Sequence, residues 1–95
     1  MATQIFGHNL SQDDLATQLK AVVAAIKFDY KELVNDFTEE WLGAFGTVNF
    51  SIMGSKIWVT LEPGETELTV ETNDPFGQVM PTIAPKIEVA LQKRS

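Results

Sequence analysis

Residues 48–71 constrain the fold most, because apolar and polar side chains alternate along them through two turn signals. The segment reads VNFSIMGSKIWVTLEPGETELTVE. Alternation of this kind is typical of β-strands that bury one face and expose the other. Gly54-Ser55 fits a two-residue type II′ loop, and EPGE at 62–65 closes a second hairpin. Three consecutive antiparallel strands are therefore expected.

The two loops together predict one strand register. In this register two apolar rows share a face: Ile52–Ile57–Val70 and Phe50–Val59–Leu68. A slip of one residue at either loop would send these side chains to opposite faces. On the other face Lys56 is expected opposite Glu71 as a charge pair, and Trp58 stands at the centre of an otherwise polar surface.

Two amphipathic helices are expected around these strands. LSQDDL at 10–15 places Ser11 as the N-cap of the first helix, with Asp14 three residues later as in a capping box. The apolar spacing beyond this cap allows two interpretations: the helix runs to about residue 37, or it breaks near KFDYKE at 27–32, where Asp29 and Glu32 could cap a second helix. We favour a bend or break. The second helix is expected to start between Thr82 and Pro85, since proline is tolerated only in a first turn, and to run to about Lys93.

These elements predict a single α+β domain over residues 1–95. The three-stranded antiparallel sheet packs on the N- and C-terminal helices, which gives an α-β-β-β-α two-layer sandwich. The segment FTEEWLGAFG at 37–46 is expected to be a connector between the first helix and the sheet.

Composition excludes several classes of function. The 95-residue chain has no cysteine, so it forms no disulfide, thiolate metal site or cysteine nucleophile. The formal net charge is −6, and residues 29–74 hold ten acids against two lysines, which disfavours nucleic-acid binding. No apolar run approaches the roughly 20 residues of a membrane span, and we expect a cytoplasmic protein.

No catalytic, metal-binding or cofactor-binding residues are predicted, and the chain is not expected to be an enzyme. His8 is the one histidine, and the nearest acids in the sequence, Asp13 and Asp14, are explained by helix capping. No glycine-rich phosphate loop and no metal-ligand spacing is present in the sequence.

An exposed tryptophan is costly to leave uncovered, and tryptophan is enriched at binding hot spots. Trp58 is expected to be covered by its own chain, by a second copy through the open sheet face, or by a partner. The leading hypothesis is a non-catalytic module that binds a protein partner or an apolar surface. Its predicted contact residues are Trp58, Met53, Trp41, Leu42 and Phe45, with Glu67 and Glu71 as an acidic rim.

Two alternatives stay open beside this hypothesis. One is a phage-encoded inhibitor or structural assembly subunit, which shares the same binding physics. The other is a small apolar-ligand carrier or enzyme. It requires a cavity lined by Phe50, Val59 and Leu68 with a polar group pointing inward.

His8 with NLSQDDLATQL, the strand pair FSIMGSKIWVTLEPGETELTVET and the closing PKIEVALQK occur in this order along the chain. In this arrangement the sequence resembles the polyhydroxyalkanoic acid system proteins, a family of small bacterial proteins. The segment KELVNDFTEEWLGAFG and the low arginine content depart from that pattern. The resemblance implies an association with storage-granule metabolism through binding, and it implies no catalytic residues.

Overall fold

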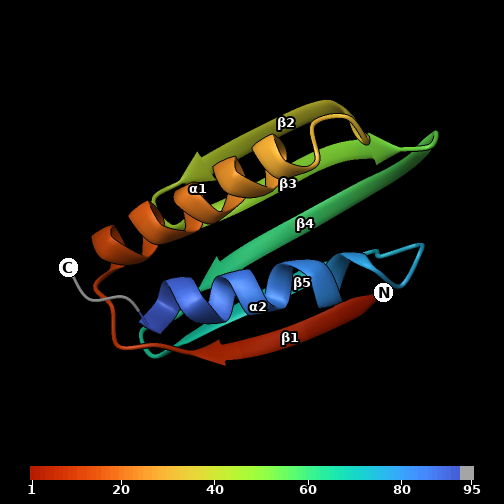
Figure 1. Cartoon of the computed structure of the whole chain (residues 1–95). Coiled ribbons are helices and arrows are strands. Elements are labelled where there is room, and N and C mark those ends of the chain that lie inside the picture. Colours follow the sequence, from red (N-terminus) through yellow and green to blue (C-terminus); the bar gives the residue numbers. More distant parts are fainter. Residues whose placement is uncertain (93–95) are drawn as a thin grey trace.

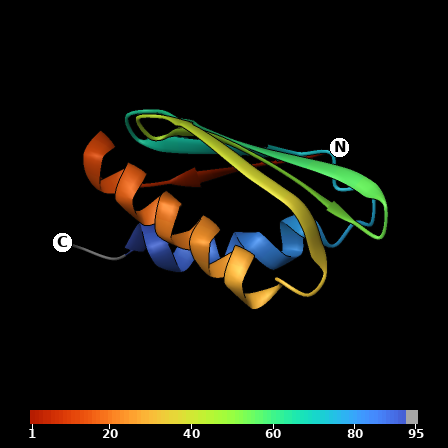
Figure 2. The same ribbon diagram turned by 90° about the horizontal axis from the view of Figure 1, so that it is seen from above.

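A computed structural model of the chain describes residues 1–92, which form five strands and two helices. In chain order the elements are β1 (Ala2–Gly7), α1 (Gln12–Asp29), β2 (Val34–Leu42), β3 (Phe45–Ile52), β4 (Ser55–Pro63), β5 (Glu67–Thr72) and α2 (Val79–Gln92). The strands form one antiparallel sheet in the order β1-β5-β4-β3-β2. Both helices cover the same face of this sheet (Figure 1), and Figure 2 shows the two layers edge-on.

The predicted three-stranded sheet is wrong, although the α+β class holds. The sheet has five strands, and the two unexpected ones, β1 and β2, lie at its edges. β1 was not predicted because it has only six residues and its partner strand, β5, lies more than 50 residues later in the sequence. β2 takes up residues 37–42 of the segment that was expected to be a connector, and β3 already begins at Phe45 within it.

β2 was missed because a β-bulge interrupts its alternation. The pairing with β3 shifts between Asn35 and Thr38, and Asp36 has a φ of 55° there. The extra residue turns Phe37 toward the helices, where its ring stacks on Phe50 with centroids 5.8 Å apart. The inserted residue gives the strand an apolar spacing of three and four residues, which is typical of a helix, so the strand was not predicted.

Helix α1 begins as predicted and ends at the earlier of its two expected ends. The Ser11 hydroxyl accepts a hydrogen bond from the Asp14 N–H at 3.1 Å, which confirms the N-cap. The helix stops at Asp29, and the Tyr30 N–H makes its last bond, to the Ile26 carbonyl. The predicted break is therefore confirmed, but the residues after it form β2 and not a second helix capped by Asp29 and Glu32.

Helix α2 starts earlier than predicted, at Val79. The Asp74 carboxylate caps it from five residues upstream, accepting hydrogen bonds from the N–H groups of Val79 at 2.8 Å and Met80 at 3.2 Å. Pro81 falls within the first turn, where its missing N–H costs nothing. Pro85 lies inside the helix on an exposed position. The predicted end at Lys93 lies outside the described residues.

The β3–β4 turn differs from the predicted one by one position. Met53 and Gly54 form the loop, with φ values of 52° and 82°. Positive φ at both central residues defines a type I′ turn, which matches the twist of a hairpin. Phe50 therefore pairs with Ile57 and not with Val59.

The predicted β4–β5 register is also wrong: each β4 residue pairs with a β5 residue four positions further along the chain than expected. Val59 pairs with Thr72, where Leu68 was expected. The β3 partner of each β4 residue is shifted by two residues and the β5 partner by four. Because both shifts are even numbers, every side chain stays on its predicted face. The expected Lys56–Glu71 pair does not form, because Lys56 lies opposite Ser51 on β3 and Glu71 opposite Thr60.

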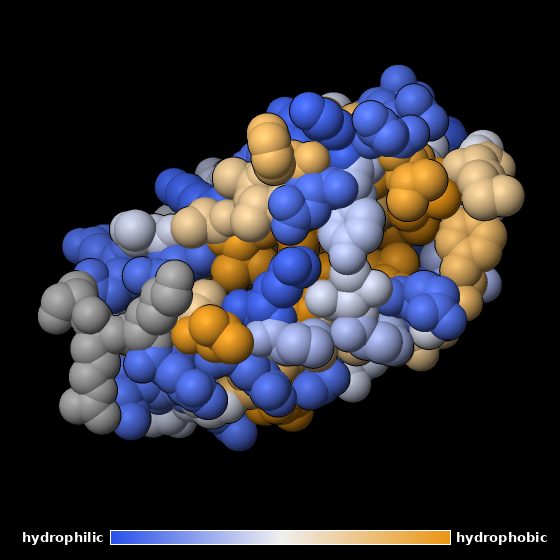
Figure 3. Space-filling model, viewed as in Figure 1, coloured by the Kyte–Doolittle hydropathy of each residue, from blue (hydrophilic) through white to orange (hydrophobic). Residues whose placement is uncertain are grey.

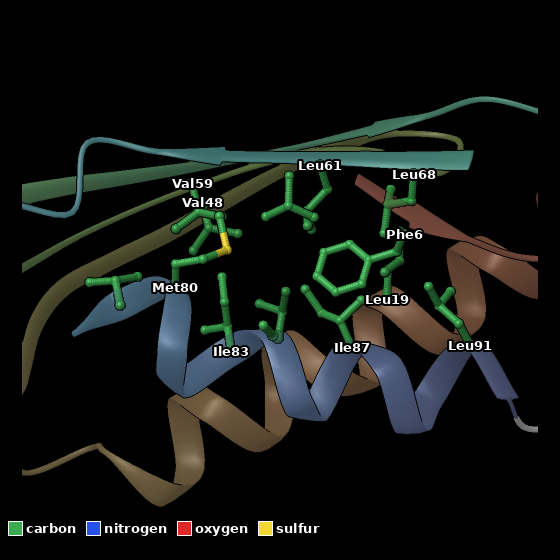
Figure 4. Close-up of a cluster of buried hydrophobic side chains, with 14 of the residues drawn as sticks. Phe6, Leu19, Val48, Val59, Leu61, Leu68, Met80, Ile83, Ile87 and Leu91 are labelled. Atoms are coloured by element: carbon green, nitrogen blue, oxygen red, sulfur yellow. The ribbon is translucent and has the colours of Figure 1, made fainter. Parts of the chain in front are cut away.

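The core lies between the helices and the inner sheet face (Figure 4). Met80, Ile83, Ile87 and Leu91 of α2 point toward the sheet, where they meet side chains of β1, β3, β4 and β5. Leu15 and Leu19 of α1 are fully buried. At the β2 edge Trp41 lies opposite Gly46 on the helix side, and Lys20 of α1 covers its ring.

His8 joins the end of β1 to the β4–β5 turn and is buried. Its Nδ1 accepts a hydrogen bond from the Leu10 N–H at 3.1 Å, so its Nε2 carries the proton and donates to the Gly64 carbonyl at 3.0 Å. Gln12 donates to the same carbonyl at 3.1 Å. Both ring nitrogens are therefore occupied by structural bonds.

Replacing His8 tests this structural role. We expect His8→Ala to lower the free energy of unfolding by about 1–3 kcal/mol, because the Leu10 N–H loses its acceptor. His8→Asn keeps an acceptor near the Nδ1 position and should recover more stability than His8→Gln, since Gly64 retains its bond from Gln12. Urea denaturation measures all three. Equal losses for the Asn and Gln variants would contradict the assignment.

Replacing Gly46 tests the packing of Trp41. A Cβ at Gly46 would lie 2.5 Å from Cζ3 of the Trp41 ring. We expect Gly46→Ala to destabilise the protein by about 1–3 kcal/mol through overpacking. Gly7→Ala is the matched control, because the nearest atom to its new Cβ would be 4.0 Å away. Thermal unfolding of the two variants side by side gives the comparison.

Candidate functional site

An open cleft of about 310 Å³ lies at the end of the molecule where α1 stops. We call it the terminal cleft. Its apolar walls include Leu33, Val34, Phe37, Phe50, Ile52 and Met53, and the first turn of α2 closes the other side. Figure 3 shows apolar side chains gathered at this end of the helical face. Size and lining are those of a binding pocket.

The terminal cleft exists because the sheet extends past the helix that should cover it. Ile26, in the last turn of α1, is the final helical residue on this wall, and the chain then turns through 30–33 into β2. The stacked rings of Phe37 and Phe50 continue beyond that point. The inner sheet face is thus left without a helical cover here.

Three exposed apolar side chains stand at the mouth of the terminal cleft. Leu33 is 56% exposed, Met53 84% and Phe76 44%, and all three also belong to its lining. We call these three residues the rim. A rim of this kind adds apolar surface outside the cleft to that inside it.

Met53 is held in the rim at a local cost. A methionine with a φ of 52° occupies a turn position that glycine and asparagine prefer. Strain of this kind in an exposed residue points to a role for its side chain.

Phe76 is presented by a tight turn between β5 and α2. The Gly77 N–H donates to the Asp74 carbonyl at 3.1 Å, which leaves Pro75 and Phe76 at the two corners. On the sheet side, Asn73 donates through its side-chain amide to the Lys56 carbonyl at 2.8 Å, and its Oδ1 accepts from the Trp58 N–H at 3.0 Å. The turn is therefore fixed at both ends.

Polar groups are few in the terminal cleft. Tyr30, Gln78 and Thr82 contribute to its walls. Lys27 lies over the Phe37 ring with its Nζ 5.2 Å from the centroid. The arrangement suits an apolar occupant with a small number of polar contacts.

The terminal cleft continues inward into a smaller apolar space of about 40 Å³ between the helices and the sheet. Phe50 and Val59 line this inner space, as the ligand-carrier alternative required. Leu68 does not line it, and every lining residue is apolar, so the inward polar group of that alternative is missing from this space. Its volume holds about one methyl group or water molecule.

The structure separates the residues that were predicted to form one contact surface. Trp58 lies on the outer sheet face, as predicted, but its partner on β3 is Asn49 and not the expected Ser51, and it is partly buried. Leu42 and Phe45 pair with each other at the β2–β3 turn, at the opposite end of β3 from Met53. Trp41 lies on the helix side of the sheet and does not cover Trp58. Of the five, Met53 alone belongs to the terminal cleft.

The predicted acidic rim is divided as well. Glu71 lies opposite Thr60, one position along the face from Trp58, and accepts a hydrogen bond from Thr3 at 3.3 Å. Glu67 lies opposite Gly7, beyond the last paired residue of β4. At about 3.3 Å per residue it stands roughly 20 Å along the sheet from Trp58.

Sequence reasoning missed most of the terminal cleft because its residues come from segments far apart in the chain. Leu33 and Phe76 were parts of helical spacings in the sequence, and neither carries a local signal of a binding site. The signal that could have found Met53 is its place before Gly54, where a methionine is unusual.

Other site classes receive no support from the described residues. No group of three His, Asp or Glu side chains in residues 1–92 could hold a metal ion. Neither helix within that range is long and apolar enough to cross a membrane.

Comparison with known proteins adds no relative. No protein-family model matches the chain, and neither the curated proteins nor the solved structures contain a match. The resemblance to polyhydroxyalkanoic acid system proteins therefore stays a prediction.

Proposed function

We propose that this chain is a non-catalytic binding module of the cytoplasm that receives an apolar segment of a protein partner in the terminal cleft. The observation that carries the proposal is the union of an apolar cleft of about 310 Å³ with an apolar rim. Large exposed apolar surface of this kind on a small domain is typical of interaction sites.

The rim favours a protein partner over a small ligand. A small molecule inside the terminal cleft would leave Leu33, Met53 and Phe76 partly in water. A partner segment that enters the cleft covers the rim as well. The inner space of about 40 Å³ is also too small to extend the site for a carrier.

The charge of the chain adds a preference for the kind of partner. A net charge of −6 attracts basic surfaces and accelerates their encounter. We therefore propose a partner segment with apolar anchors and basic flanks. The storage-granule surface suggested by the sequence resemblance offers apolar contacts without such flanks.

Partner identity can be tested by capture on the immobilised chain from a bacterial lysate. A protein that is retained by the native chain, and lost when Phe76→Ser is immobilised, supports the proposal. Recovery of polymer or lipid granules without such a protein would overturn the choice of a protein partner. Retention that is equal on both chains would overturn the terminal cleft as the site.

Replacing Met53 with asparagine is expected to raise the stability of the protein and to weaken binding at the terminal cleft. We expect Met53→Asn to raise stability by about 1 kcal/mol, because asparagine tolerates the left-handed conformation better. The same variant should bind an apolar fluorescent probe such as anilinonaphthalene sulfonate about fivefold more weakly, the equivalent of ~1 kcal/mol of lost apolar contact.

Leu42→Asn is the matched control for this experiment. Leu42 is 83% exposed, almost as exposed as Met53, but lies at the other end of β3. Thermal unfolding and probe titration of both variants give the comparison. An equal loss of probe binding in the Leu42 variant would contradict the proposed site.

A further inference from the structure

The two edges of the sheet differ in how well they are protected against pairing with another strand. An edge strand offers unpaired N–H and C=O groups, and proteins commonly block it with charges or bulges. β2 carries both devices, the bulge at Asp36 and the acids Asp36, Glu39 and Glu40. β1 reads ATQIFG and has no charged residue, no proline and no register shift.

The hydrogen-bond pattern shows which groups of β1 are free. The His8 N–H donates to the Thr66 carbonyl, so His8 faces β5, and in an antiparallel pair alternate residues do so. Thr3, Ile5 and Gly7 therefore direct their backbone N–H and C=O groups away from β5. Within residues 1–92 these groups have no hydrogen-bond partner. Figure 1 shows β1 as the outermost strand with no element beyond it.

From these observations we propose that β1 pairs with β1 of a second copy, which joins two sheets into one across a two-fold axis. This inference is independent of the proposed function, because the terminal cleft lies elsewhere. One register uses every free group: Ile5 opposite Ile5 of the second copy, with each Thr3 opposite a Gly7. This register forms three hydrogen-bonded residue pairs.

The side chains support the same register. Ile5 is 58% exposed on the outer sheet face, and pairing across the axis covers it with its own copy. Cross-strand pairs of β-branched residues stabilise antiparallel sheets. Gly7 leaves room for Thr3 of the other copy, since no side chain stands there.

Charge does not oppose this arrangement. The nearest acids on the outer face, Glu67 and Glu71, are on β5. In the dimer the two β5 strands are separated by three strand spacings, about 14 Å. This exceeds the Debye length of about 10 Å at 0.1 M salt. A β2–β2 pair would instead bring Glu39 and Glu40 directly beside their own copies.

A closed two-fold dimer also explains why protection of the β2 edge alone is sufficient to prevent open-ended association. Pairing of β1 with β2 of another copy would be head-to-tail and would continue without end. The bulge and the acids of β2 block that route. β1–β1 pairing consumes the unprotected edge of both copies and stops at two.

Solution mass tests the proposal first. Light scattering over a series of concentrations should approach twice the 10.5 kDa chain mass. Ile5→Lys places two cations at the axis and should return the mass to one chain, with circular dichroism confirming that the variant is folded. Thr38→Lys, at an exposed position of the other edge strand, should leave the dimer intact.

Cysteine cross-linking tests the register, because the native chain has no cysteine. Opposed Cα atoms lie about 5.5 Å apart in a hydrogen-bonded pair, within disulfide range, so Ile5→Cys should form a covalent dimer on oxidation. Thr3→Cys should not, because the two Thr3 residues would be about 13 Å apart along the strands. A mass of one chain at all concentrations, a dimer that survives Ile5→Lys, or cross-linking through Thr3→Cys would each overturn the proposal.

Discussion

The structure depends on one constraint: two helices must cover the apolar face of a five-stranded sheet. They cover most of it, and side chains of α2 and α1 close over β1, β5 and β4 with little space left (Figure 4). Toward β2 and the β3–β4 turn the cover ends, because α1 stops at Asp29. The terminal cleft is the part of the inner sheet face that the helices do not reach.

The faces of the strands could be predicted from the sequence, although their pairing could not. Alternation determines which side chains share a face, and any error of an even number of residues preserves that choice. Trp58 therefore stays on the outer face while every partner of β4 differs from the prediction. The turn type was open to error because Gly54 suits the first position of a type II′ loop and the second of a type I′ loop equally.

The edge strands and the start of α2 needed information that lies outside their own segments. β1 is a strand because it pairs with β5. In β2 the bulge at Asp36 interrupts the alternation of apolar and polar residues that would have indicated a strand. α2 begins at Val79 because Asp74 reaches its first N–H groups from another turn. Of the residues that line the terminal cleft, Met53 and Phe50 had been assigned to possible sites from the sequence, and the others meet only through tertiary contacts.

The pairing of β1 with β5 has a consequence for how the chain reaches its native state. Thr3 and Glu71, which share a hydrogen bond, are 68 residues apart in the sequence, whereas β2 to β5 are joined by short turns. Loop closure over a long segment costs more entropy than closure of a hairpin. Formation of the β2–β5 meander therefore costs less entropy than the pairing of β1 with β5, which closes the longest segment of the sheet. The hydrogen bonds of His8 to the carbonyls of Gly64 and Thr66 hold the end of β1 against the β4–β5 turn once this long segment has closed.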